Sequence, residues 1–187
     1  VTLESYPGMT SMQYKELHSG NYHEELKKYS SLKKVITEEE ELERRLAYAE
    51  KKKNAKLFDG IAKLLTELHG LGHILILNTN AFTANCLPLL EKVGIISLFD
   101  MIATAELSKS KVEKFKLIEE KYHVHSSDTI FITDALGDVR EADIAGVPTI
   151  AVTWGVHDIT FFNRENHSNV IKIATSVDEL RDTLLHL

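Results

Sequence analysis

Residues 129–152 have the pattern of a strand, a loop, a helix and a second strand. Residues 129–133 are β-branched or aromatic, which is the composition of a buried strand. Apolar residues at helical spacing follow, and the helix stops at Gly146 with Pro148 two residues later. Residues 149–152 are apolar again. A strand, a helix and a strand in this order predict a parallel pair joined by a right-handed crossover.

Strands and helices alternate from residue 57 to the end of the chain. The helices are expected from apolar stripes, caps and glycine stops: residues 61–68 closed by Gly70 and Gly72, residues 83–93 stopping at Gly94, a helix opened by the capping box of Ser110 and Glu113, and a terminal helix capped by Ser176 and Glu179. The other expected strands are residues 73–77 and 101–104. This alternation predicts an α/β fold with a doubly wound parallel sheet.

Residues 1–56 differ in composition from the rest of the chain and contain no strand-like apolar run. Their composition favours two or three helices, and Thr37 with Glu40 has the spacing of a capping box. The runs of Glu, Lys and Arg indicate solvated helix faces. The apolar residues available for packing include Leu42, Leu46 and Tyr48. We expect a small helical domain here, separate from a core formed by residues 57–187.

The composition is that of a globular protein, with 43% hydrophobic and 27% charged residues among 187. A net charge of −6 provides no basic surface for nucleic acid or for an anionic membrane. The single cysteine, Cys86, excludes an internal disulfide and favours a reducing compartment. No apolar run has the length of a membrane span or a signal peptide, so we expect a cytoplasmic protein.

Two carboxylates follow the strand predicted at residues 129–133. Asp134 comes at its carboxyl end, where open parallel sheets bind ligands, and Asp138 lies in the first turn of the next helix. Paired carboxylates suit a hydrated Mg²⁺, which usually also contacts a phosphate. In the alternative interpretation, Asp138 interacts with the helix dipole and Asp134 forms a turn. This segment alone does not decide between the two.

Two further polar segments follow predicted strands. Thr79 and Asn80 offer a hydroxyl and main-chain N–H groups in front of a helix, which is a phosphate cradle or simply a helix cap. Lys109 and Lys111 precede the helix opened by Ser110, where a lysine could neutralise a phosphate, although most surface lysines are only solvated.

The order of these motifs resembles the haloacid dehalogenase superfamily, most of whose members are phosphatases. The resemblance covers residues 57–187 and rests on LFDG at 57–60, LNTN at 77–80, SKSK at 108–111, TDALGD at 133–138 and AGVPTIAVTWG at 145–155. It implies a Rossmann-like core, with residues 1–56 as a cap over the site. It also implies an aspartyl-phosphate mechanism, Mg²⁺ as cofactor and a small phosphorylated metabolite as substrate.

The resemblance assigns roles to the polar residues. Thr79, together with Asn80, would bind the phosphoryl group, and Lys109 or Lys111 would hold it beside the nucleophile. Lys109 is preferred because its spacing to the helix matches the family, with Lys111 as the alternative. Asp134 would ligate Mg²⁺, and Asp138 would support that ligand or contact the metal through water.

The family's first motif, an Asp-x-Asp after the first strand, is missing from the sequence. Asp59 and Asp100 are not substitutes, because Leu57 and Leu98 stand two positions before them. In the family the first strand lies between the strands that end near residues 77 and 133. Without it two edges would stay unpaired, at a cost on the order of 1–3 kcal/mol for each buried polar group. We therefore expect a segment of about 15–25 residues with strand and nucleophile before Val1.

Two other functions stay open. A dehalogenase would use the same nucleophile without a metal, which the two aspartates disfavour, and a module without a nucleophile would bind phosphate or regulate. His73, His123, His125 and His157 show no pairing typical of a zinc site. The sequence predicts neither the substrate nor the oligomeric state.

Overall fold

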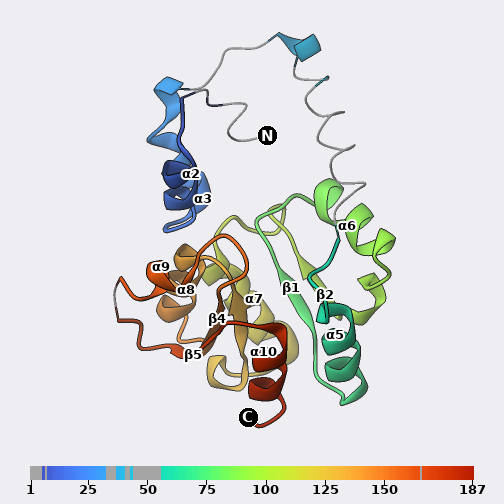
Figure 1. Ribbon diagram of the computed structural model, residues 1–187. Coiled ribbons are helices and arrows are strands. Elements are labelled where there is room, and N and C mark those ends of the chain that lie inside the picture. The colour runs from blue at the N-terminus through green and yellow to red at the C-terminus, as the bar shows by residue number, and fades with distance from the viewer. Residues whose placement is uncertain (1–5, 7, 33–36, 41–42, 44–55, 165) are drawn as a thin grey trace.

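The computed structural model describes residues 6, 8–32, 37–40, 43, 56–164 and 166–187 (Figure 1). Its α-helices are α2 (Ser11–Leu17), α3 (Tyr22–Lys27), α5 (Ile61–Gly70), α6 (Thr83–Lys92), α7 (Lys111–Tyr122), α8 (Leu136–Ile144), α9 (Ile159–Phe162) and α10 (Val177–Leu184). Its strands are β1 (Ile76–Asn78), β2 (Met101–Ala103), β3 (Phe131–Thr133), β4 (Thr149–Val152) and β5 (Val170–Ala174). None of the described helices is both long and apolar enough to span a membrane.

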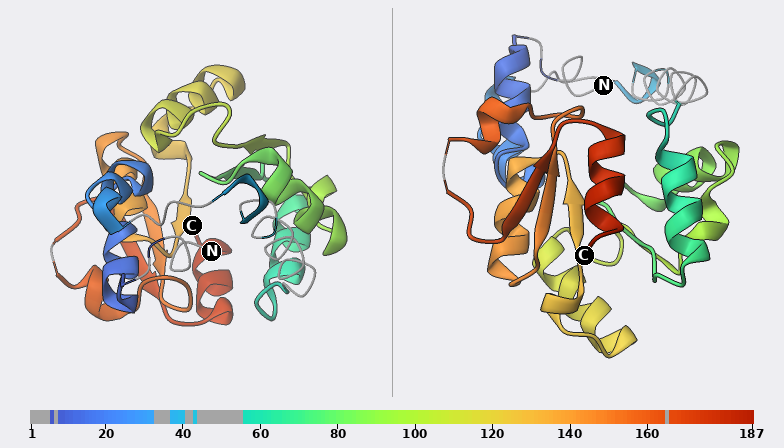
Figure 2. Two further views of the ribbon diagram at one scale, coloured as in Figure 1. Left: turned by 90° about the horizontal axis from the view of Figure 1, so that it is seen from above. Right: turned by 60° about the horizontal axis from the view of Figure 1, so that its bottom comes forward.

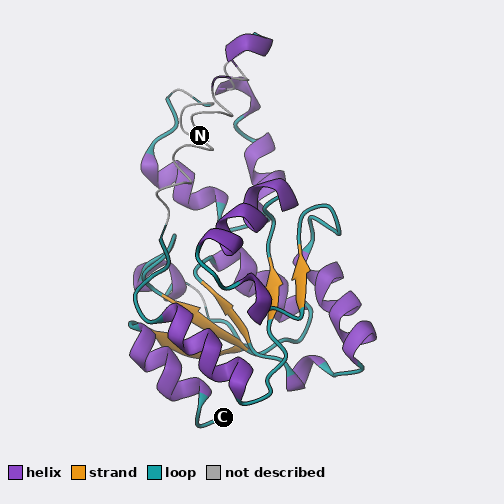
Figure 3. Ribbon diagram, turned by 90° about the vertical axis from the view of Figure 1, so that its right-hand side faces the viewer, coloured by secondary structure: helices purple, strands orange, loops and turns teal. Residues whose placement is uncertain are grey.

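The described strands form two parallel groups. β1 pairs with β2, with Leu77 opposite Ile102, and β3, β4 and β5 pair in that order. Helices connect the successive parallel strands, as a doubly wound α/β fold requires. Figure 3 shows the strand pair standing apart from the group of three. β1 and β3 do not pair with each other, so each keeps one edge unpaired among the described strands.

Helices cover both faces of the strands and hold the two groups together. Phe115 and Ile118 of α7 pack with Ile76 of β1 and Phe131 of β3 on one face. On the other face, Leu64 and Leu68 of α5 belong to one cluster with residues of β4, β5 and α10. In Figure 2, α7 and α10 lie on opposite sides of the strands. The predicted fold class is confirmed.

Two strands begin later than the sequence predicts. β1 starts at residue 76 rather than 73, because the N–H of Leu75 donates to the carboxylate of Asp100 (2.8 Å) and that of His73 to a carbonyl of α5 (3.1 Å). β3 starts at residue 131 rather than 129, because Thr129 donates to the carbonyl of Ser126 in a short 3₁₀ turn (3.1 Å). β5 was not among the strands expected from the sequence, although its residues Val, Ile, Lys, Ile and Ala favour a strand.

The helix signals proved more accurate than the strand boundaries. Ser110 caps α7 by accepting from the N–H of Glu113, and Ser176 caps α10 in the same way. α8 ends just before Gly146, whose φ of +70° is the left-handed conformation expected after a helix.

Residues 8–32 form two short α-helices and a 3₁₀ turn, η1 (Ser30–Leu32), and contain no strand. The capping box predicted at Thr37 and Glu40 is present, with N–H to side-chain distances of 2.9 and 3.2 Å. Leu42, Leu46 and Tyr48 lie outside the described residues. Figure 1 shows α2 and α3 above α8 and α9.

Candidate functional site

A cleft separates the unpaired edges of β1 and β3. It has a volume of about 560 Å³ and is lined by residues 74–76 and Asn78 on one side and by residues 129–132 on the other, with α7 among its walls. We call it the β1–β3 cleft. Asn78 is one of its lining residues, and both polar atoms of the Asn78 side-chain amide are buried without a hydrogen-bond partner among the described residues. Because buried polar groups in folded proteins are normally hydrogen-bonded, this amide is available to a further polar partner.

Asp134 follows β3 and is held by the turn after β4. Its Oδ2 accepts from the N–H of Val156 (2.7 Å), and its main-chain carbonyl accepts from the N–H of His157 (3.0 Å). A Cβ placed on Gly155 would lie less than 3.0 Å from the Asp134 side chain, so only glycine permits this approach. The turn that contains Gly155 and Val156 therefore contacts the first aspartate.

Asp138 lies in the first turn of α8 and faces a buried lysine. Its Oδ2 accepts from the Thr133 hydroxyl (2.9 Å) and is 3.5 Å from Nζ of Lys111. The same Nζ donates to the main-chain carbonyl of Asn78 (2.9 Å), and Lys111 is only 4% exposed. Lys111 thus connects the carboxyl end of β1 with the acidic segment after β3.

Thr79 and Asn80 continue the chain beyond β1. The Thr79 hydroxyl accepts from the N–H of Ala81 (3.1 Å), a local turn that orients it. A second lysine, Lys114, donates to the Thr79 carbonyl (2.7 Å) and to Oδ1 of Asn80 (2.8 Å) and is completely buried. Burial, together with Lys111, lowers the pKa of Lys114 to about 8. Lys114 was not among the site residues expected from the sequence, although its spacing of three from Lys111 places both lysines on the same helix face.

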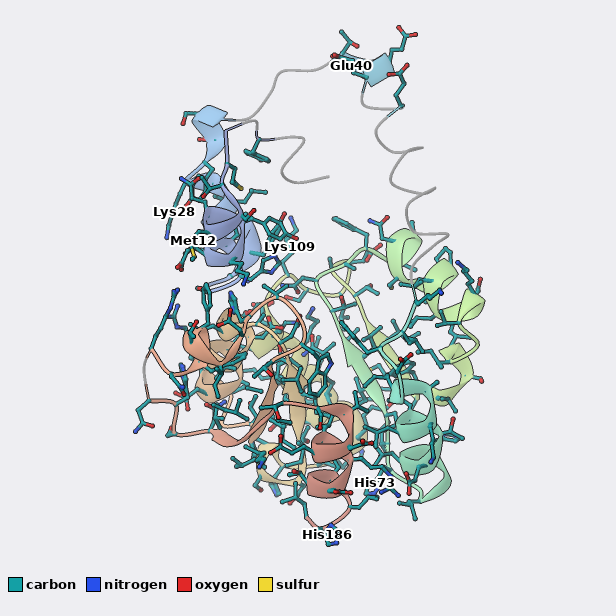
Figure 4. The ribbon with its side chains drawn as sticks, viewed as in Figure 1. Met12, Lys28, Glu40, His73, Lys109 and His186 are labelled. Carbon is teal, nitrogen blue, oxygen red and sulfur yellow. The ribbon has the colours of Figure 1, made fainter. Side chains whose placement is uncertain are left out.

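The two candidate lysines occupy different places. Lys111 is the first residue of α7 and points into the core, whereas Lys109 precedes the cap residue Ser110. The main-chain carbonyl of Lys109 accepts from the side chain of Asn21 (3.1 Å), and Figure 4 shows Lys109 beneath the N-terminal helices. The structure therefore brings Lys111, and not the preferred Lys109, to Asp138. Spacing to a helix could not separate them, because side-chain direction depends on where that helix begins.

The oxygen ligands at the carboxyl end of β3 suit a hard cation. Asp134 and Asp138 provide carboxylate oxygens, which are the ligands that Mg²⁺ prefers. Within the described ranges, no three His, Cys, Asp or Glu side chains gather closely enough to enclose a metal. Two carboxylates fit Mg²⁺, which usually takes one or two carboxylates from a protein and keeps several waters.

A histidine missed by the sequence analysis lies near the two aspartates. The ring of His18 contacts Tyr14 and Tyr22, with centroids 5.2 and 5.0 Å away. Burial lowers the pKa of His18, against the opposite effect of the aspartates at 134 and 138. Its main-chain carbonyl accepts from the N–H of Gly137 (2.7 Å), so the turn after α2 docks on the start of α8. No local sequence pattern predicts this contact, because its two residues are more than a hundred positions apart.

A family model described as haloacid dehalogenase-like hydrolase matches residues 2–152. The chain belongs to this family. The resemblance seen in its motifs is therefore confirmed. Family membership accounts for the parallel α/β core.

Three relatives illustrate the similarity. "Probable phosphatase IndB" of Dickeya dadantii is 31% identical over 104 residues, which are 54% of this chain and 45% of that protein. "Tyrosine-protein kinase PtkA" of Mycobacterium tuberculosis is 28% identical over 131 residues, 68% of this chain and 45% of that protein. The crystal structure of a predicted phosphatase from Clostridium acetobutylicum has a TM-score of 0.63 and 30% identity, and covers 71% of this chain and 61% of its own. The chain spans less than half the length of these two curated relatives.

Proposed function

We propose that the protein containing this chain is a Mg²⁺-dependent phosphatase that hydrolyses a small phosphomonoester. The observation that carries the proposal is the position of Lys111, which donates to the end of β1 and lies 3.5 Å from the carboxylate of Asp138, in the helix that follows β3. A buried ammonium beside carboxylates is suited to binding a phosphoryl group that a cation also contacts. The similarity to proteins named phosphatase and kinase supports phosphoryl chemistry over dehalogenation.

Each polar residue has a role in this proposal. Asp134 holds Mg²⁺, and Asp138 supports that site directly or through water. The hydroxyl of Thr79 and the amides around Asn80 bind phosphoryl oxygens, and Lys111 neutralises their charge. Mg²⁺, when bound, stabilises negative charge on the transferring phosphoryl group.

The nucleophile is proposed to come from a strand in the β1–β3 cleft. Among the described residues, the facing edges of β1 and β3 are unpaired and the amide of Asn78 has no hydrogen-bond partner. An extended peptide between the two edges would provide partners for both strands and for this amide. An aspartate at the carboxyl end of that strand would lie beside Lys111. Its carboxylate attacks phosphorus and displaces the alcohol, and water then hydrolyses the acyl phosphate.

The N-terminal helices are proposed to form a cap over this site. The carbonyl of His18 bonds to Gly137 and the side chain of Asn21 to Lys109, on the two segments that flank the cleft. A cap held there excludes water from the phosphoryl group and contacts the rest of the substrate.

The deciding experiment measures Mg²⁺-dependent hydrolysis of p-nitrophenyl phosphate by the protein that contains this chain. Lys111→Met is expected to lower kcat/KM by about 10²–10³-fold, the effect of losing one charge-stabilising group. Lys109→Met, its matched control, should change it less than threefold. Asp134→Asn should abolish the response to Mg²⁺.

Binding of inorganic phosphate, measured by calorimetry, separates the alternatives. Phosphate binding without hydrolysis would support the regulatory module, whose basis is the missing Asp-x-Asp motif. Transfer of phosphate to a protein tyrosine instead of water would favour a kinase. A Lys111→Met variant with unchanged phosphate affinity and activity would contradict the proposed site.

A further inference from the structure

His157 is completely buried in the loop between β4 and α9, and both of its ring nitrogens are bonded. Nδ1 accepts from the N–H of Leu136 at 2.8 Å, and Nε2 lies 2.9 Å from the carbonyl of Lys15. A main-chain N–H can only donate, so Nδ1 carries no proton. Nε2 then carries the ring proton and donates a hydrogen bond to the main-chain carbonyl of Lys15.

The partners of His157 belong to two separate parts of the chain. Leu136 begins α8 between the two aspartates, and the N–H of His157 also donates to the carbonyl of Asp134 (3.0 Å). Lys15 lies in α2. One side chain is therefore bonded to the acidic loop on one side and to an N-terminal helix on the other.

Packing holds the imidazole in this orientation. The ring stacks on Phe161 with a centroid distance of 4.1 Å and an interplanar angle of 8°. The guanidinium of Arg164 lies 3.6 Å from the centroid of that phenyl ring and forms an ion pair with Glu16 of α2 (2.7 Å). Burial lowers the pKa of His157, which favours the neutral ring that the hydrogen bonds require.

We propose that His157 is a positioning residue that couples the docking of α2 to the geometry of the loop from Asp134 to Asp138. Coupling between two sites is reciprocal, so a ligand that orders the loop also strengthens the docking of α2. The inference rests on the proposed function for the identity of that ligand, a phosphate with Mg²⁺. The contacts of His157 themselves do not depend on it.

Two substitutions separate the two bonds of the ring. In His157→Asn the amide oxygen takes the place of Nδ1 and can accept from Leu136, while the bond to Lys15 is lost. In His157→Gln the longer amide reaches the place of Nε2 and can donate to Lys15, while the bond to Leu136 is lost. His69→Gln, at an exposed position near the end of α5, is the matched control.

Hydrogen exchange of the main-chain amides measures the local stability of α2 and of the start of α8. Calorimetry measures the binding of inorganic phosphate in the presence of Mg²⁺. In the wild type, phosphate should slow exchange of the α2 amides. His157→Asn should speed exchange in α2 by about three- to tenfold, the range expected for one hydrogen bond, and remove its response to phosphate. His157→Gln should leave amide exchange in α2 close to the wild-type rate. It should speed exchange at the start of α8 and weaken phosphate binding by a similar factor.

If both variants changed hydrogen exchange equally in α2 and at the start of α8, the effect would be a loss of packing alone, and the inference would be overturned. Unchanged α2 exchange in His157→Asn would overturn it too. Urea unfolding of each variant identifies a global loss of stability. If the wild type binds no phosphate, the proposed function fails, while the different exchange patterns of the two variants still test the role of His157.

Discussion

Replacing Lys114 by methionine should change how the stability of the protein depends on pH. The ammonium is completely buried between the Thr79 carbonyl (2.7 Å) and Oδ1 of Asn80 (2.8 Å). Burial is the main reason that its pKa falls from 10.5 to about 8, and the charge of Lys111 adds to the shift, whereas Asp138 and Glu141 oppose it. Methionine has a similar length without the titrating group.

The direction of this pH dependence follows from whether the folded or the unfolded state keeps the proton on Lys114. Between pH 8 and 10.5 the unfolded chain keeps a proton on Lys114 that the folded protein has lost, so a rise in pH favours the folded state. For these two pKa values the gain is about 2.5 kcal/mol between pH 7 and pH 10. The free energy of unfolding of the wild type, minus that of Lys114→Met, should increase by that amount over this range.

Urea unfolding at four pH values between pH 7 and pH 10 measures this difference. Groups remote from Lys114 that titrate in alkali are common to both proteins and cancel. Lys116→Met, at an exposed position of α7, is the matched control for loss of a lysine from this helix. A difference that stays constant within about 0.5 kcal/mol would refute the argument, because a displaced pKa in the folded state must appear as a slope.

Three further substitutions test the contacts around the site. Gly155→Ala places a methyl group against the Asp134 side chain, and calorimetry should show Mg²⁺ affinity reduced by about tenfold or more. Gly137→Ala collides with the main chain of the turn before α3, so urea unfolding should show a loss of about 1–3 kcal/mol; Gly70→Ala, with no atom within 4 Å, should cost nothing. Ser110→Ala removes the cap of α7 and should lower the free energy of unfolding by about 1 kcal/mol, whereas an unchanged value would contradict the capping role.

Local signals predicted the helices because their determinants lie within a few residues. The caps at Ser110 and Ser176 and the stop at Gly146 act on the adjacent turn and are all present in the structure. Strand boundaries depend on distant partners instead. β1 starts late because Asp100, twenty-five positions from Leu75, takes the N–H that would otherwise extend the strand.

Hydrophobic periodicity and motif order are local properties, and they were sufficient to predict the class of fold and the types of residue at the carboxyl ends of the strands. Which of these residues contact one another depends on the packing of distant elements. It brings Lys111 rather than Lys109 to Asp138, because only the former enters the core with α7. It also gives His157 partners at positions 15 and 136, since hydrogen bonds in a buried interior depend on how the elements pack and not on their separation along the chain.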